Sequence, residues 1–185
     1  GWTLSNGVEV WFRRTDFKDD DVRMMGWAPG GHSGLSDELY VSAVLSDDVL
    51  HASGFGAHDA TALQKWLAGR TLSVSHGLGG TRQTVSGNSS VADLEGLLTL
   101  THAAMVAPRF SPEGFATVHR QQAERLGNRD QLPETKFHDA YTALVWPDDP
   151  RHQPWTEATL LNFDLDRSRT AWEARFADAG GWTLV

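Results

Sequence analysis

The pattern of apolar residues changes along the chain, and the order of these patterns constrains the fold more than any single motif. Apolar and polar residues alternate in 8–14 and 22–28, and again in 71–76 and 81–87 on the two sides of a glycine-rich turn. Such alternation is typical of strands with one buried face. Between residues 91 and 179 the apolar residues recur mostly at the spacing of about 3.6 residues that is typical of helices. A last strand is predicted at 182–185.

Strands followed by a helical run, with a strand returning at the end, predict an α+β fold. We expect a mainly antiparallel sheet with helices packed on one face. Helices are also predicted between the second and third strands, at 40–54 and after Asp59, which is a suitable N-cap, with Gly69 near the end of that helix. The chain has 185 residues and 40% hydrophobic content, which suits one domain over 1–185.

Composition excludes several classes of protein. The net charge of −8 argues against a nucleic-acid-binding protein, which needs a basic surface. The absence of cysteine excludes disulfides, thiolate zinc sites and a cysteine nucleophile. No run of 18 apolar residues exists, so no membrane span is expected. Both ends of the chain adjoin strand-like sequence, and we expect a fragment of a longer protein that lacks the end of its last strand.

The segment YVSAVLSDDVLHASG, residues 40–54, holds the candidate functional groups. One face of the predicted helix is apolar and consists of Val41, Val44, Leu45, Val49 and Ala52. Asp48 projects from this stripe, so it is predicted to be a buried acid with a structural role and a polar partner. Asp47 and His51 lie one turn apart on the flank. They lack the third ligand of a zinc site, so the pair is interpreted as a solvated contact.

The glycine-rich segment HGLGG, residues 76–80, is interpreted as a hairpin turn. It lacks the lysine and the serine or threonine of a phosphate-binding loop, and it lies between two strands rather than between a strand and a helix.

Several phrases, taken in order, resemble the pitrilysin/insulinase family of zinc metallopeptidases. They are WTLSNGVEVWFRRTDFKDDDV, APGGHSG, SVSHGLGGTRQTVSGNSSVADLEGLLTL, APRFSPEGF and DLDRSRTAWEARFADAGGWTLV. The resemblance covers nearly the whole chain. It implies a fold like that of the mitochondrial processing peptidase-like metallohydrolase domain. It also implies a parent protein whose repeated domains pair into two halves around a chamber, with the zinc motif H-x-x-E-H in the first domain only.

When the chain is aligned with the family's pattern, residues 43–47 take the place of H-x-x-E-H. Ala43 replaces the first histidine, Ser46 the glutamate and Asp47 the second histidine. Glu124 or Arg125 falls at the third ligand, and the alignment leaves both open. Alanine has no lone pair and serine is a poor base. The resemblance therefore implies a non-catalytic domain without zinc or another cofactor, most similar to the third domain of a bacterial family member.

The resemblance leaves two functions open. In the first, which we favour, the parent is a zinc-dependent endopeptidase in which zinc activates a water. This chain, inactive alone, then forms chamber wall and substrate-binding surface. In the second, the parent has lost its zinc and acts as a protein-binding scaffold. The expected partners are other domains of the parent and, in the parent, a peptide substrate. The isolated chain is expected to self-associate. The periplasm is the expected compartment, with the cytoplasm as the alternative.

Overall fold

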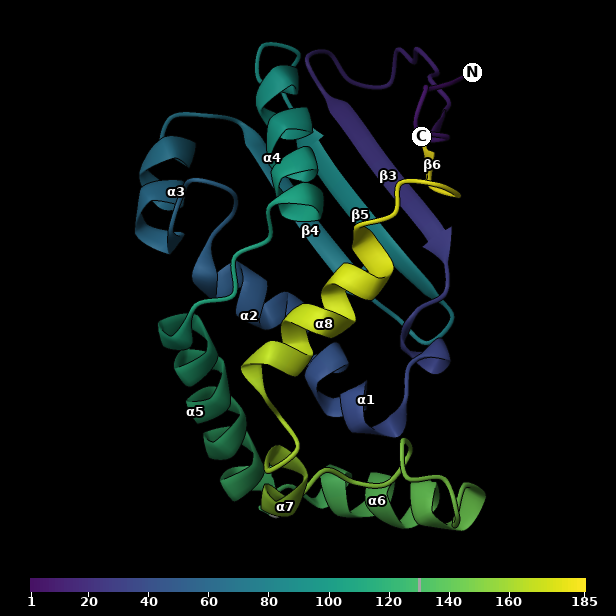
Figure 1. Cartoon of the computed structure of the whole chain (residues 1–185), viewed down its shortest axis with the longest axis vertical. Coiled ribbons are helices and arrows are strands. Elements are labelled where there is room, and N and C mark those ends of the chain that lie inside the picture. The colour runs from purple at the N-terminus through teal and green to yellow at the C-terminus, as the bar shows by residue number, and fades with distance from the viewer. Residues whose placement is uncertain (130) are drawn as a thin grey trace.

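One six-stranded sheet organises the computed structural model, which describes residues 1–129 and 131–185 (Figure 1). Its strands are β1 (Trp2–Thr3), β2 (Glu9–Val10), β3 (Val22–Pro29), β4 (Leu72–Leu78), β5 (Arg82–Ser89) and β6 (Thr183–Leu184). They lie in the order β1-β2-β6-β3-β5-β4, so the last strand of the chain is inside the sheet. Neighbouring strands are antiparallel except for β2 and β6, which are parallel.

The strands predicted at 22–28, 71–76 and 81–87 are confirmed as β3, β4 and β5, and the segment predicted at 182–185 contains β6. The strand predicted at 8–14 is much shorter, because regular pairing stops at Val10. Its partner β6 is only two residues long. The backbone N–H of Trp11 still donates to the carbonyl of Leu184 at 2.8 Å, and the chain then leaves the sheet.

Helices cover one face of this sheet. They are α1 (Asp37–Val44), α2 (Ser46–Ser53), α3 (Ala60–Leu67), α4 (Leu94–Val106), α5 (Pro112–Arg129), α6 (Pro133–Val145), α7 (Glu157–Leu160) and α8 (Leu165–Phe176), with a short 3-10 turn at His32–Gly34. Helix α4 packs on β4 and β5, and the rings of Trp172 and Phe176 in α8 lie against His76 of β4. Helices α5, α6 and α7 lie farther from the sheet (Figure 1). The expected α+β fold is therefore confirmed. In the part of the chain that the structure describes, no helix is both long enough and apolar enough to cross a membrane.

The core lies between the sheet and α8. The indole of Trp172 is fully buried, stacks on Phe176 with ring centroids 3.8 Å apart, and donates its N–H to the carbonyl of Ala104 in α4 at 3.2 Å. Helix α3 begins as predicted, because the carboxylate of Asp59 accepts the backbone N–H of Ala62 at 2.8 Å. The alternation of the strands determines which side chains reach this core and which point to the opposite face.

The helix predicted at 40–54 is interrupted at Leu45, which separates α1 from α2. The buried positions of α2 recur at helical spacing and are Ser46, Val49, Leu50 and Ser53. Two of them are serines, which a stripe drawn from apolar residues alone leaves out. Asp48 lies on the opposite side of α2 and is exposed, so the prediction of a buried Asp48 is wrong. The half-buried acid of this helix is Asp47.

Candidate functional site

Residues 43–47 span the end of α1 and the start of α2. The Ala43 side chain is fully buried, and the buried hydroxyl of Ser46 donates to the Ala43 carbonyl at 2.7 Å. This hydrogen bond satisfies the serine at the break between the helices. Ala43 offers no ligand atom, and the Ser46 hydroxyl is already engaged. The absence of the family's zinc site at Ala43, Ser46 and Asp47 stays a prediction, and this geometry favours it.

Glu124 and Arg125, the two candidates for the third ligand position, are both exposed on α5. Arg125 lines a groove together with Asp48 and Gln122. Within the described residues, Glu124 joins no group of three possible metal ligands. The structure thus does not bring either residue together with Asp47 in such a group.

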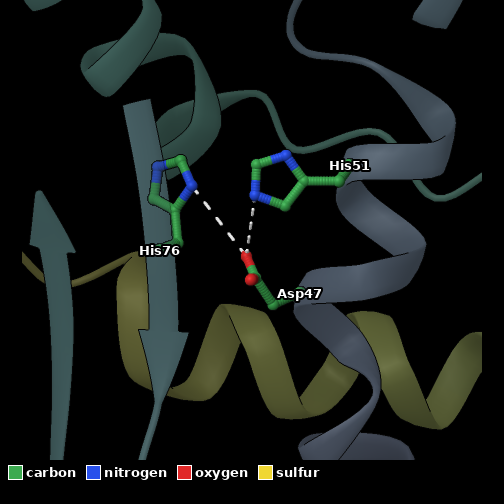
Figure 2. Close-up of side chains that lie close together, drawn as sticks. All are labelled: Asp47, His51 and His76. Atoms are coloured by element: carbon green, nitrogen blue, oxygen red, sulfur yellow. Dashed lines mark ion pairs between the residues drawn. The ribbon is translucent and has the colours of Figure 1, made fainter. Parts of the chain in front are cut away.

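A cluster that the sequence did not reveal surrounds Asp47 instead. Figure 2 shows its carboxylate between two imidazole rings, with His51 on α2 and His76 on β4. Asp47 Oδ1 lies 3.5 Å from His51 Nε2 and 3.9 Å from His76 Nδ1. One ligand atom from each of the three residues lies within 4.8 Å of the other two. The pairing of Asp47 with His51 was predicted from their spacing, but their partner His76 was not.

The cluster is buried on one side and open on the other. The His76 side chain has no exposed surface, whereas 25% of the Asp47 side chain and 39% of the His51 side chain are exposed. Aromatic rings enclose the imidazole of His76. The ring centroids of Phe55 and Trp172 each lie 5.6 Å from the centroid of the His76 ring. Within the described residues, neither His76 ring nitrogen has a hydrogen-bond partner, and the same holds for Asp47 Oδ1.

This environment changes the protonation of all three groups. Burial raises the pKa of Asp47 to about 7, and the nearby charge of Asp48 contributes to this rise. Burial lowers the pKa of His51, although Asp48 opposes this effect. Burial also lowers the pKa of His76 to about 3, with a smaller contribution from His51. His76 is therefore neutral near pH 7, and its contact with Asp47 is not an ion pair.

A second feature lies on the face of the sheet that the helices leave open. A groove of about 990 Å³ runs over β3, β4 and β5 on this face. Among the residues that line it, Ser75 and Ser86 are partners on β4 and β5, and their hydroxyls hydrogen-bond to each other at 3.0 Å. Its large apolar side chains are 37% to 72% exposed and are Trp11, Phe12, Met25 and Trp27. Contiguous exposed apolar surface of this kind is typical of an interaction site.

The sheet with helices on one face defines an α+β domain, and the sequence contains no H-x-x-E-H motif. The relatives and structural neighbours of this chain are zinc proteases of the pitrilysin/insulinase (M16) family. The chain is 35% identical over 186 residues to a zinc protease PQQL-like protein of Arabidopsis thaliana. The match covers 99% of this chain and 17% of that relative. No protein-family model matches the chain.

Two solved structures share the fold over 99% of this chain. The periplasmic protease PqqL from Escherichia coli superposes with a TM-score of 0.84 at 19% identity, and the match covers 20% of its length. An M16 peptidase inactive domain from Pseudomonas fluorescens superposes with a TM-score of 0.80 at 17% identity, and the match covers 44% of its chain. The chain thus spans less than half of each of these proteins. The family and fold predicted from the sequence phrases are confirmed, and the correspondence to a third domain stays a prediction.

Sequence reasoning missed His76, which stood at both the end of the strand predicted at 71–76 and the start of the turn at 76–80, so its side chain was not assigned to a face of the sheet. The residue is the fifth of β4, whose regular alternation places it on the helix-covered face, in the row of Leu72 and Val74. A histidine in an otherwise apolar row was the signal that could have identified it.

Proposed function

We propose that this chain, over 1–185, is a non-catalytic domain of a larger zinc metalloendopeptidase and hydrolyses no peptide alone. The observation that carries this proposal is the pair Ala43 and Ser46 in a domain of this family. Ala43 has no ligand atom, and the hydroxyl of Ser46 donates to the Ala43 carbonyl at 2.7 Å. The catalytic zinc and the general base then belong to another domain of the parent.

Within the parent, the domain forms part of the wall of a peptide-enclosing chamber and of its substrate-binding surface. The open face of the sheet supports this role. It combines exposed apolar side chains, such as Met25 and Trp27, with the hydroxyls of Ser75 and Ser86. Apolar side chains flanked by hydrogen-bonding groups suit a surface that binds extended peptides of varied sequence.

Catalytic inactivity is tested with a fluorogenic protein substrate and the purified chain, with and without added zinc. We expect the substrate to be cleaved no faster than in buffer alone. Zinc-dependent cleavage that persists through purification and disappears in Asp47→Asn would contradict the proposal.

The binding role is tested with an extended apolar peptide of about ten residues and two matched tryptophan variants. Trp27 lies on the open face and Trp146 follows α6, and their exposed fractions are similar at 37% and 40%. We expect Trp27→Ala to weaken peptide binding severalfold and Trp146→Ala to leave it unchanged. Equal effects of the two variants, or no binding by the unchanged chain, would count against a peptide surface on this face.

The same face supports a further expectation, namely self-association. The isolated chain self-associates, because no other domain covers its apolar groove. Light scattering across a concentration series tests this, and a strict monomer at high concentration counts against it. The parent is proposed to be periplasmic, with the cytoplasm as the alternative.

The second candidate function is a domain of a zinc-less scaffold. The parent's remaining sequence decides between the two, since a peptidase needs H-x-x-E-H in another domain.

A further inference from the structure

We propose that Asp47, His51 and His76 form a binding site for a divalent transition metal, and that zinc is the ion that fits it best. The site would join helix α2 to strand β4. It differs from the family's zinc site because His51 and His76 both lie outside residues 43–47. It reverses the sequence-based expectation that this chain holds no metal, since that expectation was made without His76.

The distances within the cluster suit a shared ion better than direct hydrogen bonds. Asp47 Oδ1 and His76 Nδ1 are 3.9 Å apart, which is too long for a hydrogen bond. Two bonds of about 2.0–2.1 Å to one zinc ion span up to about 4 Å, and tetrahedral angles bring the ligands to about 3.3 Å. The 3.5 Å between Asp47 Oδ1 and His51 Nε2 is already close to that value. Small rotations of the partly exposed His51 and Asp47 would complete the geometry.

The chemical type of the ligand atoms favours a transition metal. Imidazole nitrogen suits zinc, copper, nickel and iron, whereas magnesium and calcium prefer sites built of oxygen. Two imidazoles and one carboxylate supply three protein ligands, and the partial exposure of His51 leaves room for a water as the fourth. The aromatic side chains around His76 exclude water from the other side of the site.

The unpartnered atoms are an independent observation in favour of a ligand. His76 has no exposed side-chain surface and, within the described residues, no hydrogen bond to either ring nitrogen. A buried polar atom without a partner is costly, and folded proteins rarely contain one. The nitrogen Nδ1 faces Asp47 Oδ1, which is also buried and without a hydrogen-bond partner. A metal between them would satisfy both atoms.

The test uses the 185-residue chain without a histidine tag, freed of metal with a chelator. Zinc is titrated by calorimetry, and cobalt is titrated by visible absorption, which reports four-coordinate geometry. Asp47→Asn removes the negative charge of one ligand, and His51→Ala removes another ligand entirely. Both positions are partly exposed, so folding is expected to survive. The control is His102→Ala, which removes an exposed histidine from α4.

We expect one zinc ion per chain, a tetrahedral cobalt spectrum and a melting temperature that rises with zinc. Each ligand variant should lose roughly 100-fold or more in affinity, since groups that only orient metal ligands are already worth about 10–100-fold. His102→Ala should bind like the unchanged chain. The proposal is overturned if the unchanged chain takes up no stoichiometric zinc, or if Asp47→Asn and His51→Ala retain its affinity.

Discussion

Arg151 links the segment between α6 and α7 to the start of α1 through side-chain hydrogen bonds, so its replacement should lower the stability of the fold. Its Nε donates to Asp37 Oδ1 at 2.8 Å. Its Nη1 and Nη2 donate to the carbonyls of His32 at 3.0 Å and Leu35 at 2.6 Å. The guanidinium carbon also lies 5.3 Å from the ring centroid of Tyr40. One planar side chain thus holds three acceptors that lie more than 110 residues away in sequence.

The two carbonyls, rather than the ion pair, should dominate the effect. The Asp37 side chain is 72% exposed, so its pairing with arginine is worth about 0–1 kcal/mol. Arg151 is only 20% exposed, and each bond to a carbonyl contributes about 1–1.5 kcal/mol after allowance for solvent. Arg151→Ala should therefore cost about 2–4 kcal/mol. Arg151→Lys should cost about 1–3 kcal/mol, because a compact ammonium does not span both carbonyls.

Urea unfolding followed by tryptophan fluorescence and circular dichroism measures these changes, with Asp37→Ala as the matched control. Asp37→Ala removes only the exposed ion pair and should cost less than about 1 kcal/mol. The reasoning is refuted if Arg151→Ala destabilises the chain no more than Asp37→Ala does.

Three further predictions concern other parts of the fold. Trp172→Phe removes the N–H that reaches an α4 carbonyl at 3.2 Å and should cost about 1–3 kcal/mol in the same melts; an unchanged midpoint would contradict this. Gly87→Ala places a methyl group 2.8 Å from a β4 backbone oxygen and should lower the free energy of unfolding by about 1–3 kcal/mol. In the control Gly80→Ala the methyl group meets nothing within 4 Å, so the free energy of unfolding should change by no more than about 0.5 kcal/mol. Hydrogen bonds from a backbone N–H and a hydroxyl lower the pKa of Asp93 below its ordinary 3.8. Its stabilising effect is thus present above pH 3.8 and is lost as the pH falls through the folded-state pKa, so the stability difference from Asp93→Asn should vanish in acid.

The sequence predicted those parts of the fold in which local pattern and burial agree. The alternation in 22–28 and 81–87 identified β3 and β5, since each pairs along its whole length with a neighbour. The pattern failed where long-range pairing set the length, as at 11–14, where β6 offers no further partner. It also failed at Asp48. The buried face was predicted from apolar residues only, so it left out Ser46 and Ser53, the buried serines of α2. Their burial depends on close packing against other elements rather than on hydropathy.

The cluster around Asp47 shows why sequence spacing alone does not reveal every site. Asp47 and His51 are four residues apart on one helix, so their proximity follows from the helical repeat. Their partner His76 is 29 residues beyond Asp47, on a strand, and no spacing rule connects a helix to a strand. Two face assignments do connect them. The alternation of β4 places His76 on the face covered by helices. The buried positions of α2 place Asp47 on the side of that helix that contacts β4. A polar residue in the apolar row of a strand therefore predicts such a cluster when the helix that covers the strand has a polar flank.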